Sequence, residues 1–191
     1  MKALFITVFV GVLAYSGFAQ EHKHGTHDIV KSEAIDKNKK VMSPHKSAMA
    51  MVGEAHVHID YSSPRVRNRI VFGGLVGYNT VWQSGAHNVT WLETNKDLML
   101  GEKLLPAGKY AFFTIPGKNV WKVMFNSHWD QHGKDEYDPM KNIITVEVKP
   151  EKLENIQEEL DYTISKTGED IGEISLAWER VLLKLPFQVE D

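Results

Sequence analysis

The feature that most constrains this chain is a period-two alternation of apolar and polar residues that begins at Glu54. In the segment 54–61, Ala55, Val57, Ile59 and Tyr61 alternate with charged or imidazole side chains. Successive side chains of a β-strand point to opposite faces, so this pattern predicts a strand with one buried face. The folded part of the chain is therefore expected to begin as a sheet.

Further strands are predicted along the rest of the chain. Residues 110–115 are β-favouring throughout and are expected to be buried on both faces, with 120–125 as a hairpin partner across the turn 116–119. Residues 150–160 are interpreted as a loop that enters a strand, although a short helix is the alternative. Other strand-like runs lie at 143–148, 160–165, 171–178 and 181–185, the last ended by Pro186. Many short strands with little helix predict an all-β fold, an antiparallel β-sandwich or open barrel.

The first 53 residues differ from this pattern. Residues 1–19 have a positively charged start, an apolar core and small residues at Gly17 and Ala19, which is typical of a cleavable signal peptide. Residues 20–53 are polar, lack aromatic residues and hold four of the nine histidines, so they are predicted to form a flexible His/Lys-rich tether. A single domain would then span 54–191, in a protein that is secreted or periplasmic.

Composition excludes several classes of function. The formal net charge is −3, which argues against a nucleic-acid binder. The chain contains no cysteine, so a disulfide scaffold, a cysteine nucleophile, a thiolate metal site and a lipid-modified cysteine are all excluded. No later segment is long and apolar enough to span a membrane once the signal is removed. The common nucleophile-elbow, phosphate-loop, dinucleotide and zinc-protease motifs are absent, which favours a protein without catalytic activity.

Two polar loops are the best candidates for a binding site. The first contains Trp82, Gln83, Ser84 and His87, and the second, at 126–138, is long, aromatic and acidic. Pockets commonly combine an aromatic wall with a few polar groups, and long loops on β scaffolds often carry function. The full set of predicted ligand-binding residues is Tyr61, Arg69, Tyr78, Trp82, Gln83, Ser84, His87, Trp129, Asp130 and His132.

Metal binding is an alternative for the same loops. His87, Asp130 and His132 would offer two nitrogens and one oxygen to a divalent ion such as zinc, copper or nickel. Asp135 or Glu136 would then be a candidate base in a metallohydrolase.

Other features of the sequence admit a binding or a structural interpretation. His56 and His58 are two residues apart, so on a strand they share one face roughly 7 Å apart and are able to share a metal. An exposed face between Glu54 and Asp60 is the simpler interpretation. The alternating arginines at 65, 67 and 69 are either an anion clamp or solvated charges, and the glycines of 72–78 indicate a bulge or a close approach to a ligand.

The chain contains, in order, the segments Tyr61-Ser62-Ser63-Pro64, Phe72-Gly73-Gly74-Leu75-Val76, Val81-Trp82, Ser84-Gly85-Ala86, Leu105-Pro106-Ala107-Gly108-Lys109-Tyr110, Phe113-Thr114-Ile115-Pro116-Gly117 and Trp121. Taken together, these segments resemble the domain of unknown function 2911 family of secreted bacterial proteins. The resemblance spans about Glu54 to Pro186. It implies a small β-sandwich-like domain in the periplasm or outside the cell, and it implies no activity. The sequence departs from the family at Asn68 and at Gly77. It also has Gln83 where the family often has arginine, and His87 where the family often has asparagine.

Three hypotheses follow from the sequence. The first is a non-catalytic module that binds an unknown small ligand or an envelope component between the two loops. The second is a metal-binding protein or metallohydrolase that uses His87, Asp130 and His132. The third is a structural domain that binds a partner in a larger envelope assembly. The first two require that the two loops, far apart in the chain, lie together in the fold.

Overall fold

The computed structural model describes residues 42–190. The predicted signal peptide and the tether as far as Val41 lie outside the described residues. The strands are β1 (His45–Val52), β2 (Ala55–Ser62), β3 (Trp91–Thr94), β4 (Leu98–Leu100), β5 (Lys103–Leu105), β6 (Gly108–Ile115), β7 (Trp121–Asn126), β8 (Asn142–Val148), β9 (Glu151–Lys166) and β10 (Ile171–Val189), with one 3-10 helix, η1 (Pro139–Lys141). The described residues contain no α-helix, so the all-β prediction is confirmed.

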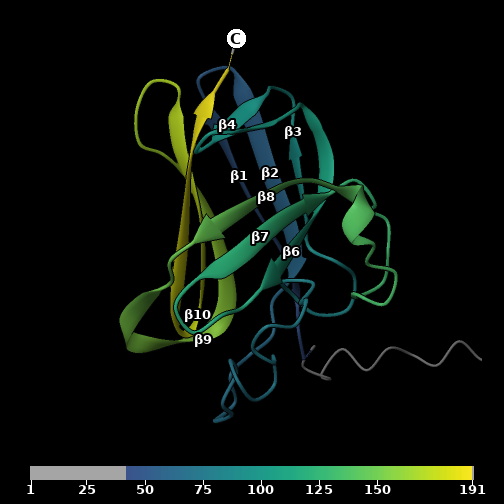
Figure 1. Ribbon diagram of the computed structural model, residues 1–191. Coiled ribbons are helices and arrows are strands. Elements are labelled where there is room, and N and C mark those ends of the chain that lie inside the picture. The colour runs from purple at the N-terminus through teal and green to yellow at the C-terminus, as the bar shows by residue number, and fades with distance from the viewer. Residues whose placement is uncertain (1–41, 191) are drawn as a thin grey trace, which may run out of the picture. The chain divides into compact units, whose positions relative to one another are not determined.

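The strands form two antiparallel sheets. The six-stranded sheet has the order β1-β2-β3-β6-β7-β8, and the four-stranded sheet has the order β5-β4-β10-β9. In Figure 1 the long pair β9 and β10, coloured yellow-green to yellow, lies beside the layer that contains β6, β7 and β8. Of the two predicted architectures, the sandwich is therefore the one found. No helix in the described part of the chain has the length and apolar character needed to cross a membrane.

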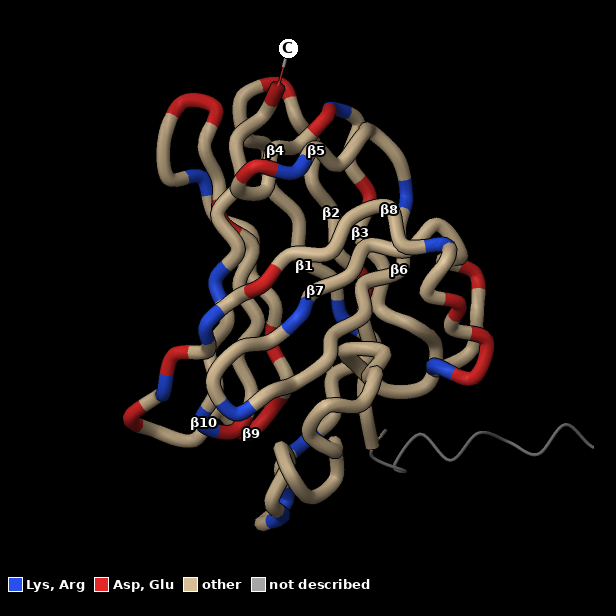
Figure 2. The backbone as a smooth tube through the Cα atoms, in the orientation of Figure 1, with Lys and Arg blue, Asp and Glu red and all other residues tan. Residues whose placement is uncertain are grey.

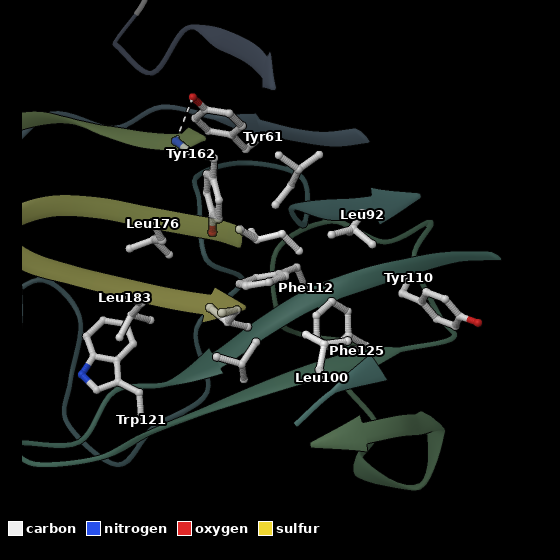
Figure 3. Close-up of a cluster of buried hydrophobic side chains, with 14 of the residues drawn as sticks. Tyr61, Leu92, Leu100, Tyr110, Phe112, Trp121, Phe125, Tyr162, Leu176 and Leu183 are labelled. Atoms are coloured by element: carbon white, nitrogen blue, oxygen red, sulfur yellow. Dashed lines mark hydrogen bonds between the residues drawn. The ribbon is translucent and has the colours of Figure 1, made fainter. Parts of the chain in front are cut away.

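The main core lies between the two sheets. Alternate residues of β2 and β7 point into it, including Val57, Ile59, Val123 and Phe125, and β9 and β10 supply the facing side. Figure 3 shows rings of both sheets meeting there, with the backbone N–H of Tyr162 donating to the Tyr61 hydroxyl at 3.2 Å. Strand β6 is buried along most of its length, as predicted from its sequence.

Three sequence predictions need correction. Residues 45–52, assigned to the flexible tether, form strand β1, whose inward positions include the small residues Ala48 and Ala50. The segment 151–160 belongs to strand β9 and is neither a loop nor a helix. Pro186 does not end its strand, because β10 continues to Val189 with the proline on an exposed position.

The outer face of the six-stranded sheet carries a smaller second core. Ala111, Phe113 and Met124 point away from the main core and are buried under Val89 and Tyr137. Val89 lies in the long connection between β2 and β3, and Tyr137 lies in the connection between β7 and β8. Both polar loops singled out in the sequence are thus packed on the same face of the same sheet.

Candidate functional site

The two loops meet directly. Asn88 and His132 form an antiparallel bridge, and the backbone N–H of Val89 donates to the Gln131 carbonyl at 3.2 Å. Between the side chains, Nδ1 of His132 donates to Oδ1 of Asn88 at 2.9 Å. In a neutral imidazole this leaves Nε2 of His132 as an acceptor. The requirement that the two distant loops lie together is met.

The second loop is held on the sheet by contacts at both of its ends. The ring of Tyr137 packs edge-on against Phe113 with 4.8 Å between ring centroids. At the end of β7, the buried side-chain amide of Asn126 donates to the Asp138 carbonyl and to Oδ1 of Asn142, each at 2.9 Å. These bonds tie the two ends of the β7–β8 loop together, so the loop presents its middle part, 128–136, at a defined position.

A hollow of about 400 Å³ lies where the loops meet β1 and β2, and we call it the interloop hollow. Trp91 of β3 and Trp129 of the second loop contribute aromatic surface to its wall. Three imidazoles and three carboxylates contribute polar groups: His45, His87, His132, Asp60, Asp130 and Glu136. An aromatic wall with converging polar groups is the usual make-up of a small-ligand site.

The residues that line the interloop hollow include three carboxylates and no lysine or arginine. Two of them have imidazole neighbours, since Oδ1 of Asp60 lies 2.8 Å from Nε2 of His45 and Glu136 lies 3.8 Å from Nε2 of His128. Figure 2 shows the acidic positions of the second loop in red along the connection between β7 and β8. Electrostatic focusing in a concave site therefore favours neutral or cationic ligands over anions.

One lysine contacts both tryptophans that line the interloop hollow. The ammonium of Lys109 on β6 lies 3.5 Å from the ring centroid of Trp91 and 4.0 Å from that of Trp129. A cation between two indole faces is attracted by both ring quadrupoles. Lys109 therefore links the second loop to β3 and sets the separation of the two tryptophans.

Tyr61 borders the interloop hollow, but only 3% of its surface is exposed and its ring packs against Tyr162 in the main core, with 4.7 Å between ring centroids. Its hydroxyl donates to Oδ1 of Asp161 at 3.1 Å while it accepts from the backbone of Tyr162. Burial, opposed by the Tyr162 N–H bond, raises the pKa of Tyr61 to about 12. With its hydroxyl bonded inside the protein and its ring in the main core, Tyr61 supports the floor of the hollow from within the fold.

Ser84 lies in the interior and supports the first loop from beneath. Its side chain is fully buried, and its hydroxyl donates to Oγ1 of Thr114 at 3.0 Å. Its carbonyl accepts from Oγ1 of Thr90 at 3.0 Å and from the hydroxyl of Tyr162 at 2.8 Å. Ser84 therefore positions the loop, although the sequence suggested a ligand contact.

A second hollow of about 320 Å³ lies on the other side of the first loop, and we call it the indole hollow. Trp82 and Gln83 line it together with His87, which also lines the interloop hollow. Trp82 stacks on Trp178 with 5.6 Å between ring centroids and donates from Nε1 to the Gly85 carbonyl at 3.0 Å. Seven of the ten predicted ligand residues line a hollow, and they are divided between these two neighbouring ones.

Arg69 and Tyr78 line neither hollow. The guanidinium of Arg69 donates to the carbonyls of Val66 and Arg65, at 3.0 Å and 2.6 Å, and so braces its own turn. The ring of Tyr78 covers Gly73, where an added Cβ would lie 2.6 Å from Cε2 of the tyrosine. Both residues shape the connection between β2 and β3.

The predicted metal ligands share a hollow without forming a metal site. His87, Asp130 and His132 all line the interloop hollow. Within residues 42–190, however, no three His, Asp or Glu side chains are grouped closely enough to hold a metal ion. The candidate bases also differ in position, because Glu136 lines this hollow and Asp135 does not.

Several residues in or beside the interloop hollow were not predicted from the sequence. His45 belongs to the segment that was predicted to be a flexible tether, but it is the first residue of strand β1. Asp60 and Trp91 lie on outward positions and face each other in the register of β2 and β3. The position of Asp60 follows from the period of β2, whereas no sequence pattern indicates that Lys109 lies between two tryptophans.

Comparison with known proteins gives one match. A family model described as "Protein of unknown function (DUF2911)" matches residues 43–187. No curated protein and no solved structure matches the chain. The match covers all ten strands except the last two residues of β10, and so includes both hollows.

Proposed function

The chain belongs to the DUF2911 family of proteins of unknown function, and from this premise we propose that it is a non-catalytic module that binds a small polar ligand. The interloop hollow is the proposed site. The observation that carries the proposal is the joining of two distant loops by the Asn88–His132 bridge around one concave space. A loop pair held this firmly is preorganised, which lowers the entropy cost of binding.

The composition of the hollow suggests the class of ligand. Its carboxylates, Asp60, Asp130 and Glu136, disfavour anions, and its imidazoles offer donors and acceptors to hydroxyl or amine groups. The indole of Trp129 offers an apolar face on the exposed side of the hollow. We therefore propose a compact ligand that is uncharged or cationic and carries several hydrogen-bonding groups.

The proposed setting is outside the cytoplasm. The N-terminal pattern of residues 1–19 and the family resemblance both support a secreted or periplasmic protein, with an envelope component as an alternative source of the ligand. Expression with a C-terminal tag, followed by cell fractionation and N-terminal sequencing, tests this setting. Recovery of an uncleaved chain from the cytoplasm would contradict it.

Fragment binding followed by two-dimensional NMR tests the proposed site. Glucosamine, glucose and gluconate are similar in size and hydroxyl content but differ in charge, so they form a matched set of probes within a larger polar fragment library. The proposal predicts that bound fragments shift the signals of Trp91, Trp129 and His132, and that cationic and neutral members outnumber anionic ones. Binding that clusters elsewhere, or that favours anions, would contradict the proposal.

The variant Asp130→Asn provides a further control because it removes one charge from the hollow and preserves the side-chain shape. We expect weaker binding of cationic fragments and unchanged binding of neutral ones. The variant Asp170→Asn, at the turn between β9 and β10, alters net charge equally and should leave both classes unchanged.

A further inference from the structure

The exposed face of the β1–β2 hairpin carries methionine and histidine side chains next to each other. On β1 the outward positions include Met49 and Met51, with 59% and 55% of their surface exposed. On β2 the outward positions include His56 and His58. None of these residues lines the interloop hollow, so this group is separate from the proposed ligand site.

The strand register brings the four side chains together. In the antiparallel pairing of β1 and β2, Met49 lies opposite His58 and Met51 lies opposite His56. Residues directly opposite in such a pair have Cβ atoms about 4.5–5.5 Å apart and point to the same face. Along β2, the two imidazole rings have centroids 6.2 Å apart. The four side chains therefore occupy neighbouring positions on one small surface.

These side chains are able to converge on one ion. A methionine side chain is unbranched, with three rotatable bonds, so its sulfur adjusts to a site formed by rigid neighbours. The imidazoles are placed by the strand, and the ring of His58 is further fixed edge-on against Trp91, with 5.0 Å between centroids. A frame of two strands with two adjustable sulfurs suits a metal ion that accepts few ligands.

The chemistry of the donors selects the kind of metal. Thioether sulfur is a soft ligand that favours Cu(I), and imidazole also binds copper, whereas Mg²⁺ and Ca²⁺ require oxygen ligands. The chain has no cysteine, so a thiolate cannot provide the soft donor. Nearby charge favours a cation, because Glu93 of β3 lies opposite His58 in the sheet.

A second observation points to the same place. Nε2 of His58 is covered by surrounding atoms and has no hydrogen-bond partner among the described residues. A covered polar atom without a partner is uncommon in folded proteins and calls for an explanation, of which a bound ion is one. This nitrogen lies on the strand that pairs with the one carrying Met49 and Met51.

We propose that Met49, Met51, His56 and His58 form a binding site for a soft monovalent metal ion, Cu(I) or its redox-inert counterpart Ag(I). The two sulfurs and one or both imidazoles bind the ion on the outer face of the β1–β2 hairpin. The site is separate from the interloop hollow, so an experiment that disproves one of the two proposals leaves the other unaffected.

Titration of the full chain with Ag(I), followed by NMR of ¹³C-methyl-labelled methionine, tests the proposal. The chain has seven methionines, so the spectrum is simple, and single Met→Leu variants assign the signals. At one equivalent of Ag(I) the methyl signals of Met49 and Met51 should shift together. The signal of Met140, which is 88% exposed on η1, should not move. Unmoved signals of Met49 and Met51 would overturn the proposal.

Variants establish which donors matter. The double variant Met49→Leu/Met51→Leu keeps side-chain size and removes both sulfurs, and Met140→Leu is its matched control. Loss of even an outer partner of a metal site weakens binding about 10- to 100-fold, so we expect at least about a tenfold loss of Ag(I) affinity in the double variant and none in the control. Equal affinity in the double variant and the wild type would overturn the proposal.

Two further measurements separate this site from other metal-binding groups. The variant His22→Gln/His24→Gln/His27→Gln removes the N-terminal histidine run, and the shifts of Met49 and Met51 should persist in it. Zn(II) at equal concentration should not displace Ag(I), because zinc lacks the preference for thioether sulfur. Loss of the methionine shifts in the first measurement, or displacement in the second, would overturn the assignment to a soft ion at this site.

Discussion

The buried hydroxyl of Ser84 gives a sharp test of how the first loop is held. In the variant Ser84→Ala, Oγ1 of Thr114 loses the hydroxyl that bonds to it at 3.0 Å. Thr114 is fully buried, and it has no other hydrogen-bond partner for this atom among the described residues. A buried polar group left without its partner costs about 1–3 kcal/mol. For a domain of this size that corresponds to a fall of about 2–12 °C in Tm.

The backbone at Ser84 adds a second, opposite effect. Its φ is 55°, in the left-handed region where a residue with a Cβ is disfavoured by about 1–2 kcal/mol. Ser84→Gly loses the same hydroxyl but relieves this strain, at a cost of about 0.4–1 kcal/mol in added freedom of the unfolded chain. We expect Ser84→Gly to be more stable than Ser84→Ala by roughly 0.5–1 kcal/mol.

Urea unfolding followed by circular dichroism measures both variants, and fragment mapping by NMR compares their binding. We expect the free energy of unfolding of Ser84→Ala to fall, while fragments still bind at Trp129. A variant of unchanged stability that no longer binds fragments would refute the reasoning, because it would make Ser84 a ligand contact.

Two further predictions concern Tyr61 and Lys109. Because the pKa of Tyr61 in the folded state is raised to about 12 from an ordinary value of 10.0, its contribution to stability is complete below pH 10 and is lost between about pH 10 and 12. Urea unfolding across that range should show falling stability, with a shallower slope in Tyr61→Phe; an equal slope would contradict the assignment. Lys109→Met removes the ammonium between Trp91 and Trp129 and should lower the free energy of unfolding by about 0.5–2 kcal/mol, whereas exposed Lys118→Met should have almost no effect. Equal losses in the two lysine variants, measured by urea unfolding, would remove the support for the cation–π contact.

The strands that could be predicted from the sequence are those with a clear strand pattern of their own. Strand β2 alternates cleanly, and residues 110–115 of β6 are β-favouring throughout, so both were predicted close to their observed bounds. Strand β1 escaped prediction because its inward positions are mostly small alanines and a lysine, which give a weak apolar signal. Its pairing with β2 provides the burial that its own sequence does not indicate.

The strand β9 was misjudged for a different reason. Its pairing with β10 shifts register on both sides of Glu179, and such bulges interrupt the period of two. As a result, Leu153, Ile156 and Leu160 are spaced three and four residues apart, as on one face of a helix. Glu179 itself has a φ of 56°, and its carboxylate accepts from the backbone N–H of Val71 at 3.2 Å, a contact that no local pattern indicates.

The candidate site was predictable in its parts but not in its arrangement. The two polar loops could be identified because they combine aromatic and ionisable residues after core strands. Their meeting depends on the second core around Phe113, whose partners Val89 and Tyr137 are distant in sequence. For the same reason the division between two hollows, and the internal role of Ser84, follow only from the fold.

An engineered disulfide between the loops tests the central claim most directly. The chain has no cysteine of its own, so Asn88→Cys/His132→Cys places the only two thiols at the observed bridge. Opposed residues in an antiparallel bridge have Cα atoms about 4.5–5.5 Å apart, within the range a disulfide spans. Mild oxidation of the folded monomer should give one intramolecular disulfide, whereas Asn88→Cys/Lys118→Cys should retain free thiols. Free thiols or only intermolecular disulfides in the Asn88→Cys/His132→Cys protein would show that the loops do not meet.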